Sequence, residues 1–193
     1  IAPLAAKEGA DPLAHDDGVR PDTTAEGLAR LRPAFSPEGT ITAGNASQIT
    51  DVAAAVVLVA EDAVAELGAT PIARVLATTF VAGPDVSLHD QPAAAIEAAL
   101  AKAGRQASEL AAVEINEAFA AVGLRSTQRL GVDPAIVNAH GGAIALGHPI
   151  GASGARIVGT LARQLAAAGP GSIGAAALCG GGGQGSAVLL EAV

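Results

Sequence analysis

The sequence has no tryptophan, tyrosine or methionine, and it contains only three phenylalanines among 193 residues. Half of the residues are nevertheless hydrophobic, so the core must be built from alanine, valine, leucine and isoleucine. Such side chains suit closely packed helices and parallel strands that are buried on both faces. A chain of this length is enough for one good-sized domain or slightly more.

Cysteine is also scarce, since Cys179 is the only one. A single cysteine excludes an internal disulfide and fits a reducing compartment, so we expect a cytoplasmic protein. The four histidines, at positions 15, 89, 140 and 148, are not spaced with the cysteine as zinc ligands would be. We therefore expect no metal site.

Basic residues are few, because 11 Lys and Arg stand against 19 Asp and Glu, which gives a net charge of −8. Without a basic stripe the chain is not expected to bind nucleic acid. The most apolar run, Val52–Ala60, is far shorter than the roughly 20 residues that cross a bilayer. No charged segment followed by an apolar one opens the chain. We expect neither membrane insertion nor a signal peptide.

Apolar patterns and turn residues predict alternating strands and helices, which is typical of α/β layers. The predicted strands are residues 52–60, 72–81, 112–116, 136–139, 172–178 and 187–192. The predicted helices are a short one capped by Asp22 or Thr23 and ending at Leu31, then residues 61–67, 91–103, 119–130 and 153–168. The last helix is apolar over most of its surface and is expected to be buried.

A glycine-rich loop, Asn138–Gly154, surrounds one imidazole and reads NAHGGAIALGHPIGASG. Pro149 fixes its own φ and biases His148 away from helix, so the ring should lie on a stiff turn. Ser153 is the expected N-cap of the helix that follows. A lone histidine is more often a structural residue than a catalytic one, so this loop needs support from elsewhere in the chain.

Two further stretches supply that support. Asn116–Ala120 reads NEAFA at the end of a predicted strand, and Cys179–Gly185 reads CGGGGQG after another. An amide, a glycine-framed histidine and a glycine-framed cysteine suit acyl-group chemistry. With TAGNAS at Thr42–Ser47, these motifs occur in the order and approximate spacing of one family. The chain resembles the C-terminal half of the thiolase family, of the acetyl-CoA acetyltransferase kind.

The resemblance implies a layered α-β-α-β-α fold made of two similar halves. Residues 1–49 would be the tail of a loop (lid) domain, residues 50–71 the end of the N-terminal domain, and residues 72–193 the C-terminal domain. The family's nucleophilic cysteine lies in the N-terminal half, so that half is an expected partner. We expect the chain alone to catalyse no thiolysis, and we expect a homo-oligomer, either dimer or tetramer.

The implied reaction is a reversible Claisen condensation of two acyl-CoA molecules to a 3-ketoacyl-CoA and CoA, with acetyl-CoA as the expected substrate and no cofactor. Cys179 matches the family's acid/base cysteine, whose thiol pKa can be lowered by a nearby imidazole or N–H cluster. His148 matches the base that activates the nucleophile and binds the thioester oxygen. Asn116 matches the residue that holds a water there, and the Gly181 N–H matches a donor of a second oxyanion hole.

The resemblance also predicts the groove for CoA. The matching residues are Arg20, Phe35, Ala43, Ser47, Leu88 and Phe119. Ser47 is the firmest of them because it lies within TAGNAS, whereas a core role explains Phe119 equally well. Arg20 and either Arg30 or Arg32 are the nearest cations for the CoA phosphates.

The sequence departs from the family pattern at two places. Residues 87–92 read SLHDQP where many acetyl-transferring members have Met-Gly-x-Gly-Pro, so the acyl-chain preference is not fixed. His140 replaces the second Asn of a usual Asn-Val-Asn-Gly-Gly. The rival hypothesis is a non-catalytic thiolase-like protein that binds acyl-CoA or lipid, or an inactive fragment. A ketoacyl synthase is disfavoured, because it needs a second histidine at the position of Cys179.

Overall fold

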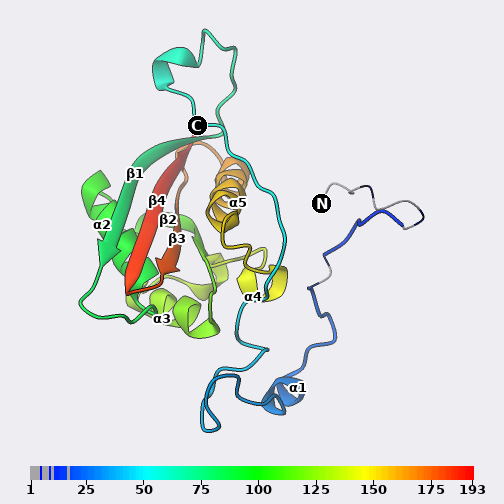
Figure 1. The fold of residues 1–193 in the computed structure, drawn as a ribbon. Coiled ribbons are helices and arrows are strands. Elements are labelled where there is room, and N and C mark those ends of the chain that lie inside the picture. Colours follow the sequence, from blue (N-terminus) through cyan, green and yellow to red (C-terminus); the bar gives the residue numbers. More distant parts are fainter. Residues whose placement is uncertain (1–4, 6–8, 10, 17) are drawn as a thin grey trace.

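The computed structural model describes residues 5, 9, 11–16 and 18–193, and Figure 1 shows their arrangement. The remainder of the predicted 1–49 segment, at 1–4, 6–8, 10 and 17, lies outside the described residues. The elements are α1 (Ala25–Ala29), η1 (Glu61–Ala63), β1 (Ala73–Ala82), α2 (Gln91–Ala103), η2 (Ala107–Glu109), β2 (Leu110–Ile115), α3 (Ala120–Leu130), η3 (Pro134–Ile136), α4 (Ala143–Leu146), α5 (Ser153–Ala168), β3 (Ile173–Gly180) and β4 (Gln184–Ala192).

A four-stranded sheet in the order β1-β4-β3-β2 forms the centre of the molecule. β2 and β3 are parallel because α3, α4 and α5 connect them, whereas β4 is antiparallel to both of its neighbours. Helices α2 and α3 cover one face of this sheet, and α5 covers the other (Figure 1). The α/β class is confirmed, and the described residues form three layers, α-β-α.

The alternation of side chains along each strand divides the core between the two faces. Val113 and Ala175 belong to the cluster under α2, and Ala112 and Ala176 belong to the cluster under α5. The small alanine side chains of β3 leave room for the helices to approach the sheet closely on both faces.

Glycine and proline set the helix ends as predicted. Helix α2 has Pro92 in its first turn, where a missing N–H costs nothing. Gly104 ends α2 and Gly131 ends α3, with φ of 67° and 65° respectively. These left-handed conformations suit a residue without a Cβ. The predicted strands at 72–81, 112–116, 172–178 and 187–192 are confirmed as β1, β2, β3 and β4.

The predicted buried strand at residues 52–60 is wrong. This segment has no regular structure and most of its residues are exposed. It passes α5 without joining the sheet (Figure 1). A strand needs hydrogen bonds to a neighbour, and no segment among the described residues pairs with this one. The predicted helix 61–67 is reduced to the single 3-10 turn η1.

The predicted strand at 136–139 is also wrong. Pro134 and Ile136 belong to the 3-10 turn η3, and only Val137 forms an isolated parallel bridge, to Val113. The side chain of Asn138 then makes the two hydrogen bonds to the β2 backbone that a neighbouring strand would otherwise make. Its Oδ1 accepts a hydrogen bond from the Ile115 N–H at 2.8 Å, and its Nδ2 donates to the Ile115 carbonyl at 2.8 Å.

Three smaller predictions about helices need correction. Ser153 is the first residue of α5 rather than its cap, because its hydroxyl donates to the Pro149 carbonyl at 3.0 Å. Helix α5 is buried on the side that faces the sheet, while Arg163 and the last alanines are exposed. The cap of α1 is Thr24, whose side chain accepts from the Gly27 N–H.

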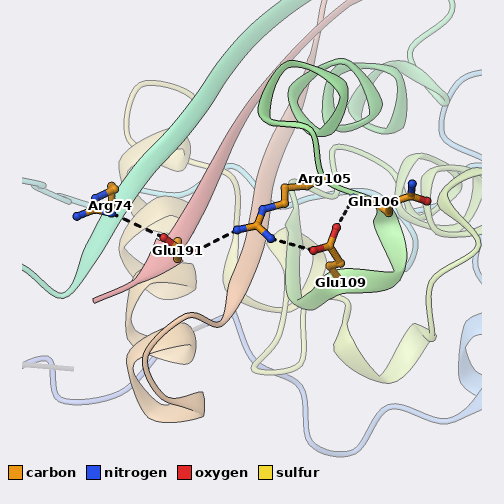
Figure 2. A network of polar contacts seen from close by, with 5 residues as sticks. All are labelled: Arg74, Arg105, Gln106, Glu109 and Glu191. Atoms are coloured by element: carbon orange, nitrogen blue, oxygen red, sulfur yellow. Dashed lines mark hydrogen bonds and ion pairs between the residues drawn. The ribbon is translucent and has the colours of Figure 1, made fainter.

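An ion-pair network around Glu191 connects β1, β4 and the segment that leads to η2 (Figure 2). Glu191 pairs with Ile173 at the start of β3, whereas Cys179 lies near the other end of that strand. Glu191 on β4 lies 3.4 Å from Arg105 and 4.0 Å from Arg74 on β1. Arg105 also pairs with Glu109 at 3.1 Å, and Glu109 accepts from the Gln106 N–H at 2.7 Å. Most of these side chains are partly exposed, so each pair contributes only about 0–1 kcal/mol.

Candidate functional site

Asn116 lies at the carboxyl end of β2, where the polar motifs of the chain converge. Its backbone N–H donates to the Ala177 carbonyl on β3 at 2.9 Å. The side chain is 1% exposed, and its Oδ1 has no hydrogen-bond partner among the described groups. A buried acceptor without a partner costs roughly 1–3 kcal/mol, so this oxygen is prepared to accept from a water or a ligand.

The TAGNAS segment runs antiparallel beside NEAFA. The Ser47 N–H donates to the Ala118 carbonyl at 3.1 Å, and the Ala120 N–H donates to the Asn45 carbonyl at 2.8 Å. Ala46 and Phe119 form the bridge between these two bonds. Two motifs that are about 70 residues apart in the sequence are thus joined by backbone hydrogen bonds.

The His148 ring is held between Asn116 and Ser153. Its Nε2 lies 3.3 Å from Asn116 Nδ2, and its Nδ1 lies 2.6 Å from Ser153 Oγ. Ser153 gives its only proton to the Pro149 carbonyl, so it must accept from Nδ1–H. Asn116 Nδ2 is a donor, which assigns the lone pair to Nε2. The network therefore selects the Nδ1–H tautomer and presents Nε2 as a base.

The electrostatic surroundings of His148 favour the neutral ring. Partial burial lowers the pKa of His148, and the positive charge of Arg156 on α5 lowers this pKa further. A neutral imidazole at physiological pH is the state that a proton acceptor requires. The backbone contributes to the position of the ring as well, because the His148 N–H donates to the Gln48 carbonyl at 2.9 Å.

Cys179 lies near the end of β3, on the strand next to Asn116, and pairs with Gly185 of β4. The thiol is half-buried, and burial raises the pKa of Cys179 above the ordinary value. This direction is opposite to the lowered pKa expected from the sequence. Among the described residues, no hydrogen bond joins the thiol to His148 or Asn116, so the expected lowering by an imidazole has no source.

The glycine run after Cys179 forms the hairpin between β3 and β4. Gly181 is exposed and has open space where a Cβ would stand. Gly183 and Gly185, in contrast, are buried, and a Cβ on either would collide with the carbonyl oxygens of Asp85 and Gln91. The glycines at these two positions let the hairpin lie directly against the loop that precedes α2.

The predicted CoA residues fall into two groups. Phe35 is 75% exposed and meets Phe119 edge to face, with ring centroids 6.1 Å apart. Ser47 lies beside the NEAFA motif, to which Phe119 belongs. The remaining three residues are not in this contact. Ala43 and Arg20 are exposed, and Leu88 packs against the core cluster under α2.

Several residues that hold the site were not predicted as such: Gln48, Glu117, Asn138 and Ser153. Gln48 Nε2 donates to the Ile144 carbonyl at 3.1 Å, at the beginning of the turn that leads to His148. Each of the four is a polar side chain inside or beside a motif that had been noticed for another residue. The side-chain partners of Gln48, Glu117 and Asn138 lie 21 to 97 residues away in the sequence, so no local pattern indicates these contacts. Those of Ser153 lie four and five residues away.

One cavity of the described residues lies away from the predicted site. A cavity of about 710 Å³ lies between the loop before α2 and helix α3, and it contains none of the predicted site residues. Its arginines are already paired, Arg125 with Asp90 and Arg129 with Glu97. Within the described ranges, no three His, Cys, Asp or Glu side chains gather as metal ligands would. No helix there has the length and apolarity to cross a membrane.

Comparison with known proteins gives matches to both parts of one family. Residues 69–192 match the sequence family "Thiolase, C-terminal domain", and residues 1–62 match "Thiolase, N-terminal domain". A Mycolicibacterium smegmatis protein named "Probable acetyl-CoA acetyltransferase" is 56% identical over 94% of this chain and 47% of its own length. The acetyl-CoA acetyltransferase of a Synechocystis strain is 45% identical over 100% of this chain and 49% of its own length.

Solved structures agree with these matches. The crystal structure of human mitochondrial 3-ketoacyl-CoA thiolase in complex with CoA has a TM-score of 0.88 and 40% identity, and it covers 100% of this chain and 48% of that protein. The dimeric peroxisomal thiolase of Saccharomyces cerevisiae gives a TM-score of 0.88 and 38% identity. The match covers 100% of this chain and 48% of that protein. The chain spans about half the length of the relatives it matches.

Proposed function

Since the chain belongs to the thiolase family, we propose that it carries the acid/base and oxyanion-binding residues of an acyl-CoA C-acyltransferase. The reaction is the reversible Claisen condensation of two acyl-CoA molecules to a 3-ketoacyl-CoA and CoA, with acetyl-CoA and acetoacetyl-CoA as the substrate pair. The observation that carries the proposal is the Asn116–His148 pair, in which Ser153 holds the proton on Nδ1 and the lone pair of the imidazole lies on Nε2, facing Asn116.

In this proposal His148 acts first as a base and then as a donor. Nε2 takes the proton of the nucleophilic thiol as that sulfur attacks the acyl carbon. The protonated Nε2–H can then donate to the thioester oxygen, while Nδ1–H stays bonded to Ser153. A water held by the unpaired Asn116 Oδ1 is the second donor to this oxygen.

Cys179 performs two proton transfers, one to the departing CoA and one from the second acetyl-CoA. Its thiol first protonates the departing CoA thiolate, and the Cys179 thiolate that results removes the α-proton of the second acetyl-CoA. The carbanion attacks the acyl-enzyme thioester, and the Gly181 N–H stabilises the oxygen of that tetrahedral adduct. The raised pKa of Cys179 suits the first transfer, because the residue must begin as a thiol.

The nucleophilic thiol has to come from polypeptide outside this sequence, because Cys179 is its only cysteine. The N-terminal half of the same enzyme is the proposed source. The proposed domains are those that the family resemblance implies. Residues 1–49 belong to the loop domain, residues 50–71 end the N-terminal domain, and residues 72–193 form the C-terminal domain.

The pantetheine arm of CoA is proposed to lie along the seam of TAGNAS and NEAFA. The exposed Phe35 and its partner Phe119 give an apolar wall, and Ser47 and Ala43 lie on the neighbouring segment. Arg20 is the proposed phosphate contact and Leu88 the contact near the acyl group. A cytoplasmic homo-oligomer, dimer or tetramer, in lipid metabolism completes the proposal.

The test uses a half-reaction that needs no nucleophile, at alkaline pH, where the Cys179 thiolate forms without a departing CoA. Acetyl-CoA is incubated with the chain in D₂O, and the exchange of its methyl protons is followed by proton NMR. Cys179→Ala and His148→Ala should each slow the exchange by at least roughly 100-fold, since acid/base catalysis contributes about that much. The matched control is His140→Asn, which alters an exposed histidine of the same loop and should leave the rate unchanged.

A non-catalytic acyl-CoA-binding protein is the alternative, and the same variants separate the two functions. Exchange that persists in Cys179→Ala would remove the acid/base assignment. CoA binding without exchange in any form, including the wild type, would favour the binding protein. Thiolysis of acetoacetyl-CoA by the 193-residue chain alone would contradict the need for an external nucleophile.

A further inference from the structure

The short helix α4 lies directly before His148, and the Glu117 carboxylate holds its beginning. Glu117 Oε2 accepts a hydrogen bond from the Ile144 N–H at 3.1 Å, in the first turn of α4. Glu117 Oε1 accepts from Asn138 Nδ2 at 2.8 Å. Both oxygens are therefore engaged by the loop that carries His148, although Glu117 itself belongs to the segment after β2.

Asn138 connects this carboxylate to the sheet. Its side chain makes the two hydrogen bonds to the Ile115 backbone described above, and its own N–H donates to the Val113 carbonyl at 2.9 Å. The residue adopts a φ of 49°, a conformation that asparagine tolerates better than most residues. The loop is thus attached to β2 through Asn138, and to Glu117 both through Asn138 and, six residues later, through Ile144.

Gly142 shows how closely the carboxylate and the loop approach one another. It is buried, and a Cβ built on it would overlap the carboxyl group of Glu117. Gly142 has a φ of −109°, so its backbone conformation alone does not require glycine. The requirement is the space that the Glu117 side chain occupies.

The connection to chemistry follows from the positions of these residues in the chain. Glu117 is the residue after Asn116, and α4 is separated from His148 only by Gly147. A group that fixes α4 relative to the end of β2 therefore also fixes the His148 ring relative to the Asn116 amide. We infer that Glu117 is a positioning residue, which sets the 3.3 Å contact between Asn116 Nδ2 and His148 Nε2. The catalytic part of this inference rests on the proposed function.

Two other roles for Glu117 would leave different signatures. As a purely electrostatic partner its negative charge would favour the imidazolium, so its removal would lower the pKa of His148 still further. As a purely structural residue it would affect unfolding but not the ring. As a positioning residue its loss should release the ring toward water, which raises the pKa of His148 toward the ordinary value of about 6.5, although Arg156 remains nearby.

The experiment is an NMR titration of the 193-residue chain labelled with ¹⁵N-histidine, in which a His148→Asn sample assigns the signal. Glu117→Gln keeps the size of the side chain but faces two N–H donors with only one acceptor. Glu117→Asp keeps the charge but is one methylene too short to reach the Ile144 N–H. Both variants should raise the pKa of His148 and populate the Nε2–H tautomer. If the first variant does not fold, the second still gives the test.

The matched control is Glu97→Gln, which removes a surface ion pair with Arg129 on the α2–α3 side. It should leave the His148 signals as they are in the wild type. Folded Glu117 variants with an unchanged tautomer and titration would overturn the inference, and so would a pKa that moves further down.

A second readout separates this inference from the proposed function. Both Glu117 variants should slow methyl-proton exchange of acetyl-CoA roughly 10- to 100-fold, because small displacements of a catalytic group have effects of that size, with the Kd for CoA unchanged. If the wild type shows no exchange, the proposed function fails while the NMR titration still decides how Glu117 acts on the ring. If exchange is present and the Glu117 variants match the wild type in both readouts, the positioning role alone fails.

Discussion

Two stretches of similar composition behave in opposite ways in this chain. Val52–Ala60 reads VAAAVVLVA, and the first six residues of β3, at 173–178, read IGAAAL. The β3 stretch is hydrogen-bonded on both sides and is nearly all buried, with Ala175 and Ala177 at 0% exposure. Val57 and Leu58 in the other stretch are 87% and 79% exposed. Apolar, β-branched composition therefore permits a strand, but neighbouring strands are what bury it.

The same contrast divides the whole molecule. From β1 to β4 every strand has a partner and both faces of the sheet are covered. The described residues of 11–60, in contrast, contain one five-residue helix and none that is fully buried. The described residues of 11–60, here called the N-terminal arm, form hydrogen bonds to the rest of the chain through TAGNAS and Gln48, next to the candidate site. The least regular part of the chain thus contributes the segments that border His148.

The largest expected difference between the two stretches follows from placing one carboxylate in each of them. Ala175→Asp puts a carboxylate into the centre of the sheet without a partner and should abolish folding, at a cost of at least about 4 kcal/mol. Val57→Asp should change the free energy of unfolding by less than about 0.5 kcal/mol. Urea unfolding followed by circular dichroism measures both. A comparable loss in Val57→Asp would show that this segment is covered in solution.

Leucine truncation should repeat the contrast on a smaller scale. Leu165 of α5 is 0% exposed and packs on the sheet, so Leu165→Ala should lower the free energy of unfolding by about 2–5 kcal/mol. Leu58→Ala removes an exposed side chain and should be close to neutral. Thermal unfolding of the pair tests this, and equal shifts in Tm would contradict the assigned burial.

Gln48 allows the boundary between the two regions to be examined. Its Nε2 donates to the carbonyls of Gly18, Ile144 and Ala145, so Gln48→Ala should cost about 1 kcal/mol. The arm should also loosen, which reduces the hydrogen-exchange protection of the Ser47 and Ala120 amides. Protection that stays at the wild-type level would mean that the backbone seam alone holds the arm.

The smallest expected effect is a pH dependence of stability due to His148. Its pKa is lowered in the folded protein, so the unfolded chain binds more protons as the pH falls below about 6.5. The stability contribution is present above that value and is lost as the pH falls through the folded pKa. His148→Asn should flatten the decline in this window, and His140→Asn should not. Equal slopes in all three proteins would contradict the assignment.

Local signals predicted much of the fold correctly. Gly104, Gly131 and Pro92 mark helix ends by their own backbone preferences, and the structure places all three as expected. Strand predictions succeeded where neighbours exist and failed at 52–60 and 136–139. At the second of these, Pro134 starts a 3-10 turn and the Asn138 side chain replaces backbone pairing. Local propensity predicts neither the 3-10 turn nor the pairing through the Asn138 side chain.

The candidate site divides in the same way. The motifs identified His148 and Asn116, which the structure joins at 3.3 Å, and Cys179, which lies on the adjacent strand. Glu117 and Ser153 were overlooked or misassigned, because their significance depends on partners brought near by the fold. The direction of the Cys179 pKa was likewise misjudged, since burial of the thiol depends on tertiary packing.

The amino-acid sequence by itself determined the α/β class, the helix ends marked by Pro92, Gly104 and Gly131, and the thiolase family of this protein, because these depend on periodicity, on glycine and proline backbone preferences and on contiguous motifs. Only the tertiary structure decided which apolar stretches are strands, which tautomer His148 adopts and which residues hold its ring. Strand pairing, desolvation and hydrogen bonds join groups as far apart in the sequence as Ala73 and Ala192, and their energies depend on distances in space that the order of residues does not specify.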